Sequence, residues 1–138
     1  SPAADGGTEQ RFLHLEDDAG RRLLIEIRLD GTGGWWLDTF LRDGESKRPL
    51  IDPLGVHRAG QWTWAALRYD GKIMAHYVNG LKEREGAVAF GPMTAGRTSL
   101  GVRQNRMYWY KGAIREVRFT RGPLREDQLQ RPGHAPAP

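Results

Sequence analysis

The sequence predicts an all-β protein, a sandwich of two antiparallel sheets with one short C-terminal helix. Residues 60–80 are the clearest indication, because two apolar arms, 62–69 and 73–79, flank the pair Asp70-Gly71. Asp-Gly tolerates the positive φ angles of a tight hairpin turn, so the two arms are expected to pair. The composition agrees, since 18 glycines and 8 prolines in 138 residues supply the turns that many short strands need.

Alternation of apolar and polar residues, interrupted by Gly, Asp and Pro, predicts the other strands. Besides the hairpin arms, we expect strands at residues 11–16, 23–29, 35–41, 87–90, 98–102, 107–110 and 113–119. Residues 45–60 contain prolines and glycines and are expected to form a long connection with one brief strand. Residues 123–130 have the only helical pattern, about two turns with Leu124 and Leu129 facing inward.

The chain is expected to form one domain over residues 9–130. Residues 1–8 and 131–138 are rich in small residues and proline, and they are expected to be flexible. The absence of cysteine excludes disulfides and cysteine-ligated zinc. No apolar run approaches the ~20 residues that cross a bilayer, so no membrane span is predicted.

The net charge of +4 does not by itself indicate a polyanionic partner, because the 21 basic residues are spread along the chain. From Arg97 onward, eight arginines and one lysine stand against three acids, so a basic C-terminal face is the alternative. The sequence contains no nucleic-acid-binding motif, and no nucleic-acid partner is predicted.

Five pieces of sequence occur in a characteristic order. They are Gly60-Gln-Trp62, Tyr69-Asp-Gly71, Tyr77-Val-Asn-Gly80, Leu100-Gly101 and Gly112–Phe119, the last followed by Leu124 and the short helix. Together they resemble the laminin G-like, concanavalin A-like jelly-roll superfamily. The resemblance implies a jelly-roll sandwich in which Trp62 fills the core, the Asp-Gly and Asn-Gly pairs make turns, and residues 113–119 return to a sheet.

The chain departs from this family at its beginning, where residues 1–10 lack the usual opening strand pattern. An absent opening strand would leave a sheet edge unpaired, and such an edge invites another chain.

The family includes glycoside hydrolases, whose active strand carries Glu-x-Asp-x-x-Glu, a spacing that places two carboxylates on one face. This sequence has no such run, and its histidines are isolated from one another. The clustered acids are expected to face solvent: Glu16, Asp17, Asp18, Glu26, Asp30, Glu83 and Glu85. The protein is therefore predicted not to be an enzyme, with a glycoside hydrolase-like activity as the third alternative.

No cofactor is predicted, with calcium as the alternative because relatives of this family often bind it through loop oxygens. The candidate ligands are Asp17, Asp18, Asp38, Asp43 and Asn105. Asp and Asn side chains also form hydrogen bonds to their own backbone in turns, and we favour this turn role for each of the five residues.

Aromatic residues beside polar ones are the strongest functional signal, because sugars stack on flat rings while Arg and Asn bond their hydroxyls. Trp35 and Trp36 are adjacent and must point to opposite sides of a strand, so one of them leaves the core. The predicted ligand-binding residues are Trp36, Arg103, Asn105, Tyr108 and Trp109. Large aromatic residues commonly fill the core of a sandwich, so packing is the more common role of such rings and stays open for the Trp36 and Trp109 clusters.

The sequence therefore predicts a non-catalytic recognition module, with carbohydrate as the leading ligand and an extracellular or periplasmic location. The alternative is a protein-interaction or assembly domain that associates through an exposed sheet edge. The hairpin at residues 60–80 is apolar on both faces, so its outer side must be covered by the chain or by a partner. The exposure of Trp64, Met74 and His76 decides between these.

Overall fold

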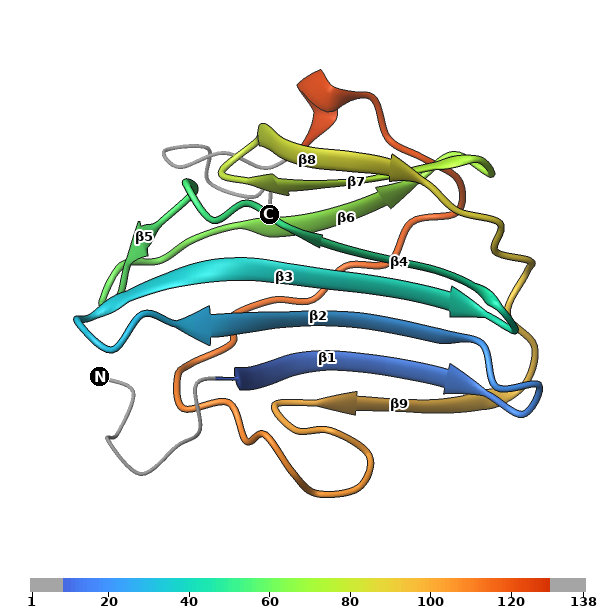
Figure 1. Ribbon diagram of the computed structural model, residues 1–138, viewed down its shortest axis with the longest axis horizontal. Coiled ribbons are helices and arrows are strands. Elements are labelled where there is room, and N and C mark those ends of the chain that lie inside the picture. The colour runs from blue at the N-terminus through green and yellow to red at the C-terminus, as the bar shows by residue number, and fades with distance from the viewer. Residues whose placement is uncertain (1–8, 130–138) are drawn as a thin grey trace.

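A computed structural model of the protein describes residues 9–129, so the expectations for the two ends, 1–8 and 131–138, lie outside the described residues. The described part forms nine strands and one 3-10 turn, η1 (Glu126–Gln128) (Figure 1). The strands are β1 (Glu9–Asp17), β2 (Arg22–Leu29), β3 (Gly34–Asp43), β4 (Ser46–Ile51), β5 (His57–Arg58), β6 (Ala65–Tyr69), β7 (Ile73–Val78), β8 (Leu81–Ala87) and β9 (Gly96–Leu100).

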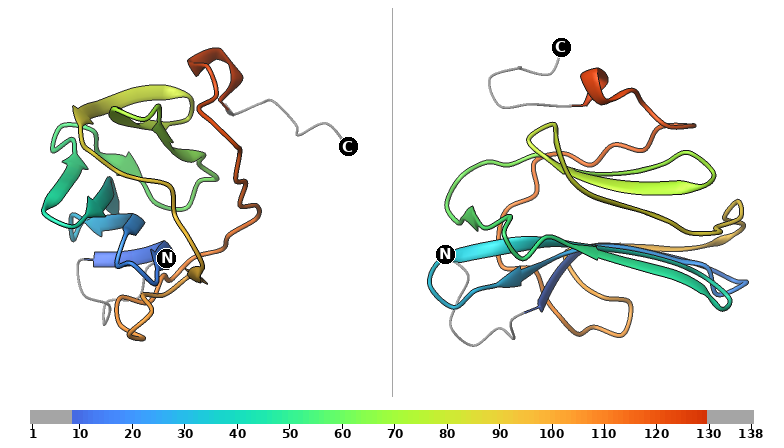
Figure 2. Two further views of the ribbon diagram at one scale, coloured as in Figure 1. Left: turned by 90° about the vertical axis from the view of Figure 1, so that its right-hand side faces the viewer. Right: turned by 45° about the horizontal axis from the view of Figure 1, so that its top comes forward.

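The strands form two antiparallel sheets that lie one over the other (Figure 2). The first sheet has six strands in the order β4-β3-β2-β1-β9, with the short β5 paired to β3. The second sheet has three strands in the order β6-β7-β8. The chain completes β1 to β5 in the first sheet, crosses to build β6 to β8, and returns with β9 beside β1. The prediction of an all-β sandwich is confirmed.

The core lies between the sheets and follows the two-residue period of the strands. In β2, Ile25 and Ile27 point inward and join one buried cluster with Trp35, Leu37 and Val78. A second cluster contains Leu41, Leu50, Met74 and Val88. Full burial of one such side chain stabilises the fold by roughly 1.5–3 kcal/mol.

The outer side of the second sheet is covered by the chain itself. Arg68 Nε donates to the Leu124 carbonyl over 2.8 Å, and the Tyr77 hydroxyl donates to Glu126 Oε1 over 3.0 Å. Ala75 and Tyr77 on the outer face of β7 are buried, and Trp64 is half-buried with the Arg118 guanidinium 5.8 Å from its ring centroid. Met74 and His76 are also completely buried, but they point between the sheets. The central hairpin therefore needs no partner to cover it.

The segment 113–119 was expected to be a strand, but it pairs with no described strand. It starts near β1, where the Lys111 N–H donates to Gln10 Oε1, and it ends against the second sheet, where Arg118 lies over Trp64. A segment that spans from one sheet to the other cannot run alongside a strand. The strand prediction was wrong for this reason, although the segment has strong β propensity.

Four smaller predictions are also corrected. Trp62 does not fill the core but is 65% exposed, because it precedes the start of β6. Residues 87–90 and 107–110 are not strands, apart from the end of β8 and an isolated bridge between Trp109 and Arg11. The helix at 123–130 shrinks to η1, which buries no residue and so lacks the packing that stabilises short helices.

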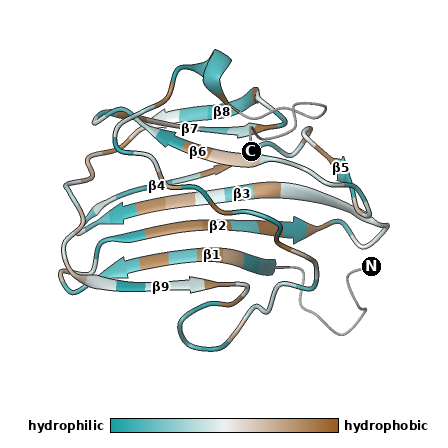
Figure 3. Cartoon of the chain, turned by 180° about the vertical axis from the view of Figure 1, so that it is seen from behind, coloured by the Kyte–Doolittle hydropathy of each residue, from teal (hydrophilic) through white to brown (hydrophobic). Residues whose placement is uncertain are grey.

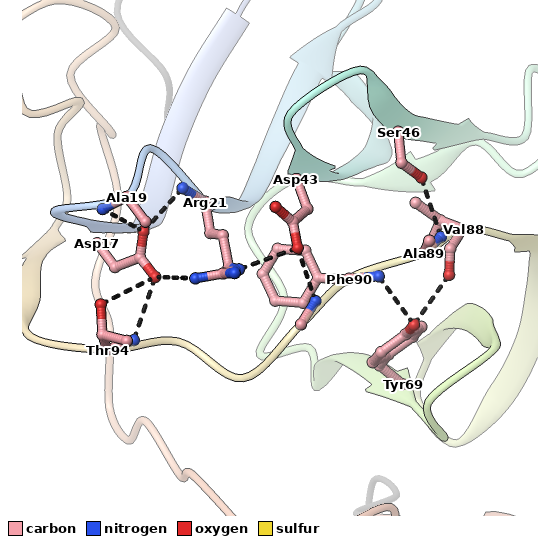
Figure 4. Close-up of polar contacts among 11 residues, drawn as sticks. Asp17, Ala19, Arg21, Asp43, Ser46, Tyr69, Val88, Ala89, Phe90 and Thr94 are labelled. Atoms are coloured by element: carbon pink, nitrogen blue, oxygen red, sulfur yellow. Dashed lines mark hydrogen bonds and ion pairs between the residues drawn. The ribbon is translucent and has the colours of Figure 1, made fainter.

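The crossover from β8 to β9 is held by polar contacts at the hairpin ends of the first sheet (Figure 4). Asp43 Oδ2 accepts from the Gly91 N–H and from Arg21, and Asp17 accepts from Arg21 and from the Thr94 N–H. Burial alone would raise the pKa of Asp17, but the bonds from Thr94 and Arg21 hold that pKa below its ordinary value. These contacts fix the edge position of β9.

Candidate binding face

The candidate site lies on the outer face of the six-stranded sheet, the side turned away from the core. Its first cross-strand row contains Glu9 on β1, Arg28 on β2 and Trp36 on β3. Its second row contains Arg11, Glu26 and Asp38 on the same three strands. We call the five charged residues of these two rows, Glu9, Arg11, Glu26, Arg28 and Asp38, the charged rows. The alternation that sends Ile25 and Ile27 inward sends these side chains outward.

Ion pairs join the charged rows into one network. Arg28 Nε lies 2.6 Å from Asp38 Oδ2, and Arg28 Nη1 lies 2.9 Å from Glu9 Oε1. Arg11 forms a close ion pair with Glu26. Burial raises the pKa of both Glu26 and Asp38, and their arginine partners offset this increase only in part. Three carboxylates share two guanidinium groups, so the network carries an excess negative charge. This charge favours the binding of a proton or of a hydrogen-bond donor from a ligand.

The segment 101–110 folds back against β1 at the edge of the charged rows. The Arg11 N–H donates to the Tyr108 carbonyl over 2.9 Å, and the Tyr110 N–H donates to the Gly101 carbonyl over 2.8 Å. The Tyr108 ring lies between two guanidinium groups, 5.4 Å from that of Arg11 and 5.8 Å from that of Arg103. Each such cation–π contact stabilises by about 0.5–1 kcal/mol at an exposed site.

This loop carries backbone strain. Arg106 and Tyr108 have positive φ angles of 61° and 58°, although neither is glycine. Such conformations cost roughly 1–3 kcal/mol each and gather at functional sites, where the surrounding structure holds them. Here the Arg11 contacts hold Tyr108 in place.

Two tryptophans flank the charged rows. Trp109 is 58% exposed and bridges Arg11 on the far side of β1. Trp36 is half-buried, and its indole N–H donates to the Pro53 carbonyl over 2.9 Å, which fixes the orientation of the ring. Three strand spacings separate the two backbone positions, roughly 14 Å. The two rings can therefore border one extended ligand.

Four of the five predicted ligand-binding residues border this face: Trp36, Arg103, Tyr108 and Trp109. Asn105 is exposed, and its Oδ1 accepts from the Met107 N–H, so its carbonyl oxygen caps the turn instead. Sequence reasoning missed Arg11 and Arg28, and it considered Asp38 only as a calcium ligand and Glu26 only as a solvated acid. The signal that could have found them is their shared outward register once β1, β2 and β3 are aligned.

Three of the four acids considered for calcium are paired with an arginine. Asp17 and Asp43 bond Arg21, and Asp38 bonds Arg28. Within residues 9–129, no group of three histidine or acidic side chains could hold a metal ion. A depression of about 380 Å³ lies elsewhere, near the turn between β6 and β7, and its lining includes neither an aromatic nor an acidic residue.

A second polar cluster lies between the sheets. His76 Nδ1 is 2.9 Å from Thr39 Oγ1, and His57 Nε2 is 2.5 Å from Glu83 Oε1. His76 is fully buried, and burial lowers its pKa to about 4. Because a ligand cannot reach His76, this cluster links the sheets and is not a candidate site.

Comparison with known proteins identifies a family for this fold. A family model described as Laminin_G_3, Concanavalin A-like lectin/glucanases superfamily, matches residues 1–130. No curated protein matches the chain significantly. Among solved structures, an S-layer domain-containing protein (residues 221–444) from Clostridium thermocellum ATCC 27405 is similar, with a TM-score of 0.40 and 15% sequence identity. That similarity covers 93% of this chain and 64% of the other, so this chain spans less than two thirds of its length.

No helix in the described part of the chain is both long and apolar enough to cross a membrane.

Proposed function

Because the chain belongs to the concanavalin A-like lectin/glucanase superfamily, we propose that it is a non-catalytic module that binds carbohydrate on the outer face of its six-stranded sheet. One observation carries the proposal: Trp36 and the exposed Trp109 flank the charged rows. Aromatic rings stack on the apolar faces of sugars, while guanidinium and carboxylate groups bond the hydroxyls. An extracellular or periplasmic location, where glycans are abundant, is part of the proposal.

The accessible groups have different roles in this proposal. Trp109 offers an open ring for stacking, and Arg28, with 41% of its side chain exposed, offers guanidinium donors beside Trp36. Arg11 and Glu26 are both less than a tenth exposed, so they stabilise the binding face and offer little surface to the ligand. Tyr108 connects the segment 101–110 to β1 through its contacts with Arg103 and Arg11.

The non-catalytic assignment rests on the state of the two opposed carboxyls. Glu26 and Asp38 face each other across β2 and β3, but each is bound to an arginine and is less than a tenth exposed. A glycosidase needs one free acid and one free base or nucleophile at the scissile bond. Reducing-sugar assays on bound glycans should show no turnover, and turnover abolished by Glu26→Gln would refute the assignment.

The binding proposal is tested by glycan-array screening followed by calorimetric titration of a bound glycan. We expect Trp109→Ala to weaken binding at least about fivefold, since stacking of a flat ring on an aromatic side chain contributes about 1–3 kcal/mol where nucleobases are bound this way. Trp62→Ala is the matched control, because Trp62 is also exposed but lies away from the charged rows. Absence of any bound glycan, or equal effects of the two variants, would overturn the proposal.

A protein-interaction or assembly domain is the second candidate. β9 pairs only with β1 in the described sheet, and Leu100, Met107 and Trp109 are each more than half exposed near its end. Exposed apolar residues beside a free strand edge are the features of an association site. Light scattering at increasing concentration tests this candidate, and a monodisperse monomer at high concentration would count against it.

A further inference from the structure

A row of basic residues crosses the same outer face at the end opposite Trp36. It contains Arg97 on β9, Glu16 on β1, Arg22 on β2, Arg42 on β3 and Lys47 on β4, in direct cross-strand register. We call it the basic row. Figure 3 shows the hydrophilic ends of β1 and β3 lying together at this end of the sheet. Six residues along β3 separate it from Trp36, roughly 20 Å.

The basic row carries four cations and one acid, and the acid is already engaged. Glu16 Oε2 lies 3.2 Å from Arg22 Nε and 3.0 Å from His14 Nε2. Burial would raise the pKa of Glu16, but the bond from Arg22 outweighs it and the pKa is lowered. Arg22 is therefore neutralised by its neighbour.

The other three cations, Arg97, Arg42 and Lys47, have no carboxylate within ion-pair distance among residues 9–129. Arg42 donates only to the Gly44 carbonyl, over 3.3 Å. These guanidinium and ammonium groups remain available to an anion.

The placement of these charges opposes folding. Arg42 lies directly opposite Lys47, and neither has a carboxylate partner among residues 9–129, whereas the charge of Arg22 on the other side of Arg42 is paired with Glu16. Like charges in directly opposed cross-strand positions destabilise a sheet. Where a sequence departs from such a rule without local compensation, a functional role is the expected reason. A ligand that supplies negative charge would remove the repulsion.

The next row toward Trp36 is apolar on β2, β3 and β4, and it continues with the buried His14 on β1 and with Ser99 on β9. Leu24, Phe40 and Pro49 lie opposite one another on β2, β3 and β4, and Leu24 and Phe40 belong to neither core cluster. Phe40 is half-buried and Pro49 is exposed. Leu24 is buried, so the face offers a basic strip beside the accessible apolar surface of Phe40 and Pro49.

We propose that the basic row binds the acidic groups of a linear anionic polysaccharide that continues from the site between Trp36 and Trp109. This inference rests on the proposed function and names its ligand class. Neighbouring strands are about 4.8 Å apart, so the row spans roughly 19 Å and suits an extended polymer. Arginine guanidinium groups bond carboxylate or sulfate oxygens in pairs, which favours an acidic ligand over a neutral one.

A polysaccharide fits this row better than a single-stranded nucleic acid. Sites for single strands place aromatic rings under successive bases. The basic row has no aromatic ring, and the adjacent row has only the half-buried Phe40 and the buried imidazole of His14. The acidic group can be a carboxylate or a sulfate, and the choice of probe separates the two.

The test uses the full chain and three probes: polygalacturonate, dextran sulfate and neutral dextran. We expect the two acidic polymers to bind, with affinity that falls as salt rises. The double variant Arg42→Gln/Lys47→Gln should weaken this binding at least tenfold. The control variant Lys72→Gln/Arg121→Gln removes the same charge at exposed positions outside the row, and it should bind within twofold of the unmodified chain.

The proposal is overturned if neither acidic polymer binds, if both double variants lose the same affinity, or if oligodeoxythymidine binds more tightly than either polymer. Trp109→Ala separates this inference from the proposed function. Loss of glycan-array binding in Trp109→Ala with no effect of the Arg42→Gln/Lys47→Gln change would refute the basic row alone. Binding of acidic polymers through the basic row, with no effect of Trp109→Ala, would refute the aromatic site alone.

Discussion

His76 provides the sharpest prediction about stability. It lies between the sheets with no exposed surface, and its Nδ1 is 2.9 Å from Thr39 Oγ1. Its Nε2 faces Glu83 Oε2 at 3.5 Å, and neither atom has a hydrogen bond. Burial lowers the pKa of His76 from 6.5 to about 4, since a charged imidazolium would lose its hydration there. Protonation of His76 therefore opposes the folded state.

The sign and size of the effect follow from proton linkage. Between about pH 6.5 and about pH 4 the unfolded chain binds a proton at this histidine and the folded chain does not. Stability is fully present above the unfolded pKa and is lost as the pH falls through this window. At 1.36 kcal/mol per pH unit, the loss attributable to His76 approaches about 3 kcal/mol.

The assay is urea unfolding, followed by tryptophan fluorescence, at several pH values from about 7 to about 4.5. His76→Asn is the informative variant, because its amide can keep the bond to Thr39 but cannot titrate. The groups that face His76 are Glu83, His57, Asp52 and Arg84. Burial raises the pKa of Glu83, which acts in the opposite direction, so the comparison with His76→Asn isolates the histidine.

We expect the variant to be less stable than the unmodified protein at neutral pH and to lose much less stability as the pH falls. Thr39→Val is the control, since it removes the hydrogen bond and keeps the titrating ring. Parallel pH dependences for His76→Asn and the unmodified protein would show that His76 does not carry the buried-proton effect.

Three further predictions concern the two faces of the first sheet. Arg42→Gln should leave stability unchanged or raise it by about 0.2–1 kcal/mol in thermal or urea unfolding, because it removes repulsion from Lys47, and a clear loss would contradict the unfavourable register. Arg11→Met should lower the free energy of unfolding by about 3–5 kcal/mol, because it leaves the buried Glu26 carboxylate without its ion-pair partner. The double variant Arg11→Met/Glu26→Leu should recover most of that loss, and an additive double variant would contradict the pairing. Asp17→Asn should lower the thermal midpoint near neutral pH and have less effect in acid, because the lowered pKa of Asp17 provides stability above its unfolded pKa that is lost as pH falls. An effect independent of pH would show that the Asp17 charge is unimportant for holding the crossover.

The central hairpin shows what local sequence can decide. Asp70 Oδ1 accepts from the N–H groups of Lys72 and Ile73, over 3.0 and 2.8 Å, and Gly71 has a φ of 98°. All of these contacts lie within four residues, so Asp-Gly specifies the turn without help from the rest of the chain. The separation of Trp35 and Trp36 onto opposite sides of β3 follows equally directly from strand geometry.

The candidate site shows what local sequence cannot decide. Trp36 and Trp109 were recognisable as rings in polar surroundings, but the charged groups between them come from three strands. Arg11, Glu26 and Asp38 become neighbours only through the register of β1, β2 and β3. A shift of one residue in that register would turn every one of them to the other face of its strand.

The sequence by itself determined β1, β2, β3 and the β6–β7 hairpin, with their turns and inward alternation, because these depend on contacts between near neighbours in the chain. Only the tertiary structure decided that residues 113–119 cross between the sheets and that Trp62 is exposed. It also decided that four cations meet in one row. These outcomes depend on which distant segment occupies each place on the sheets, and long-range pairing and packing choose that segment.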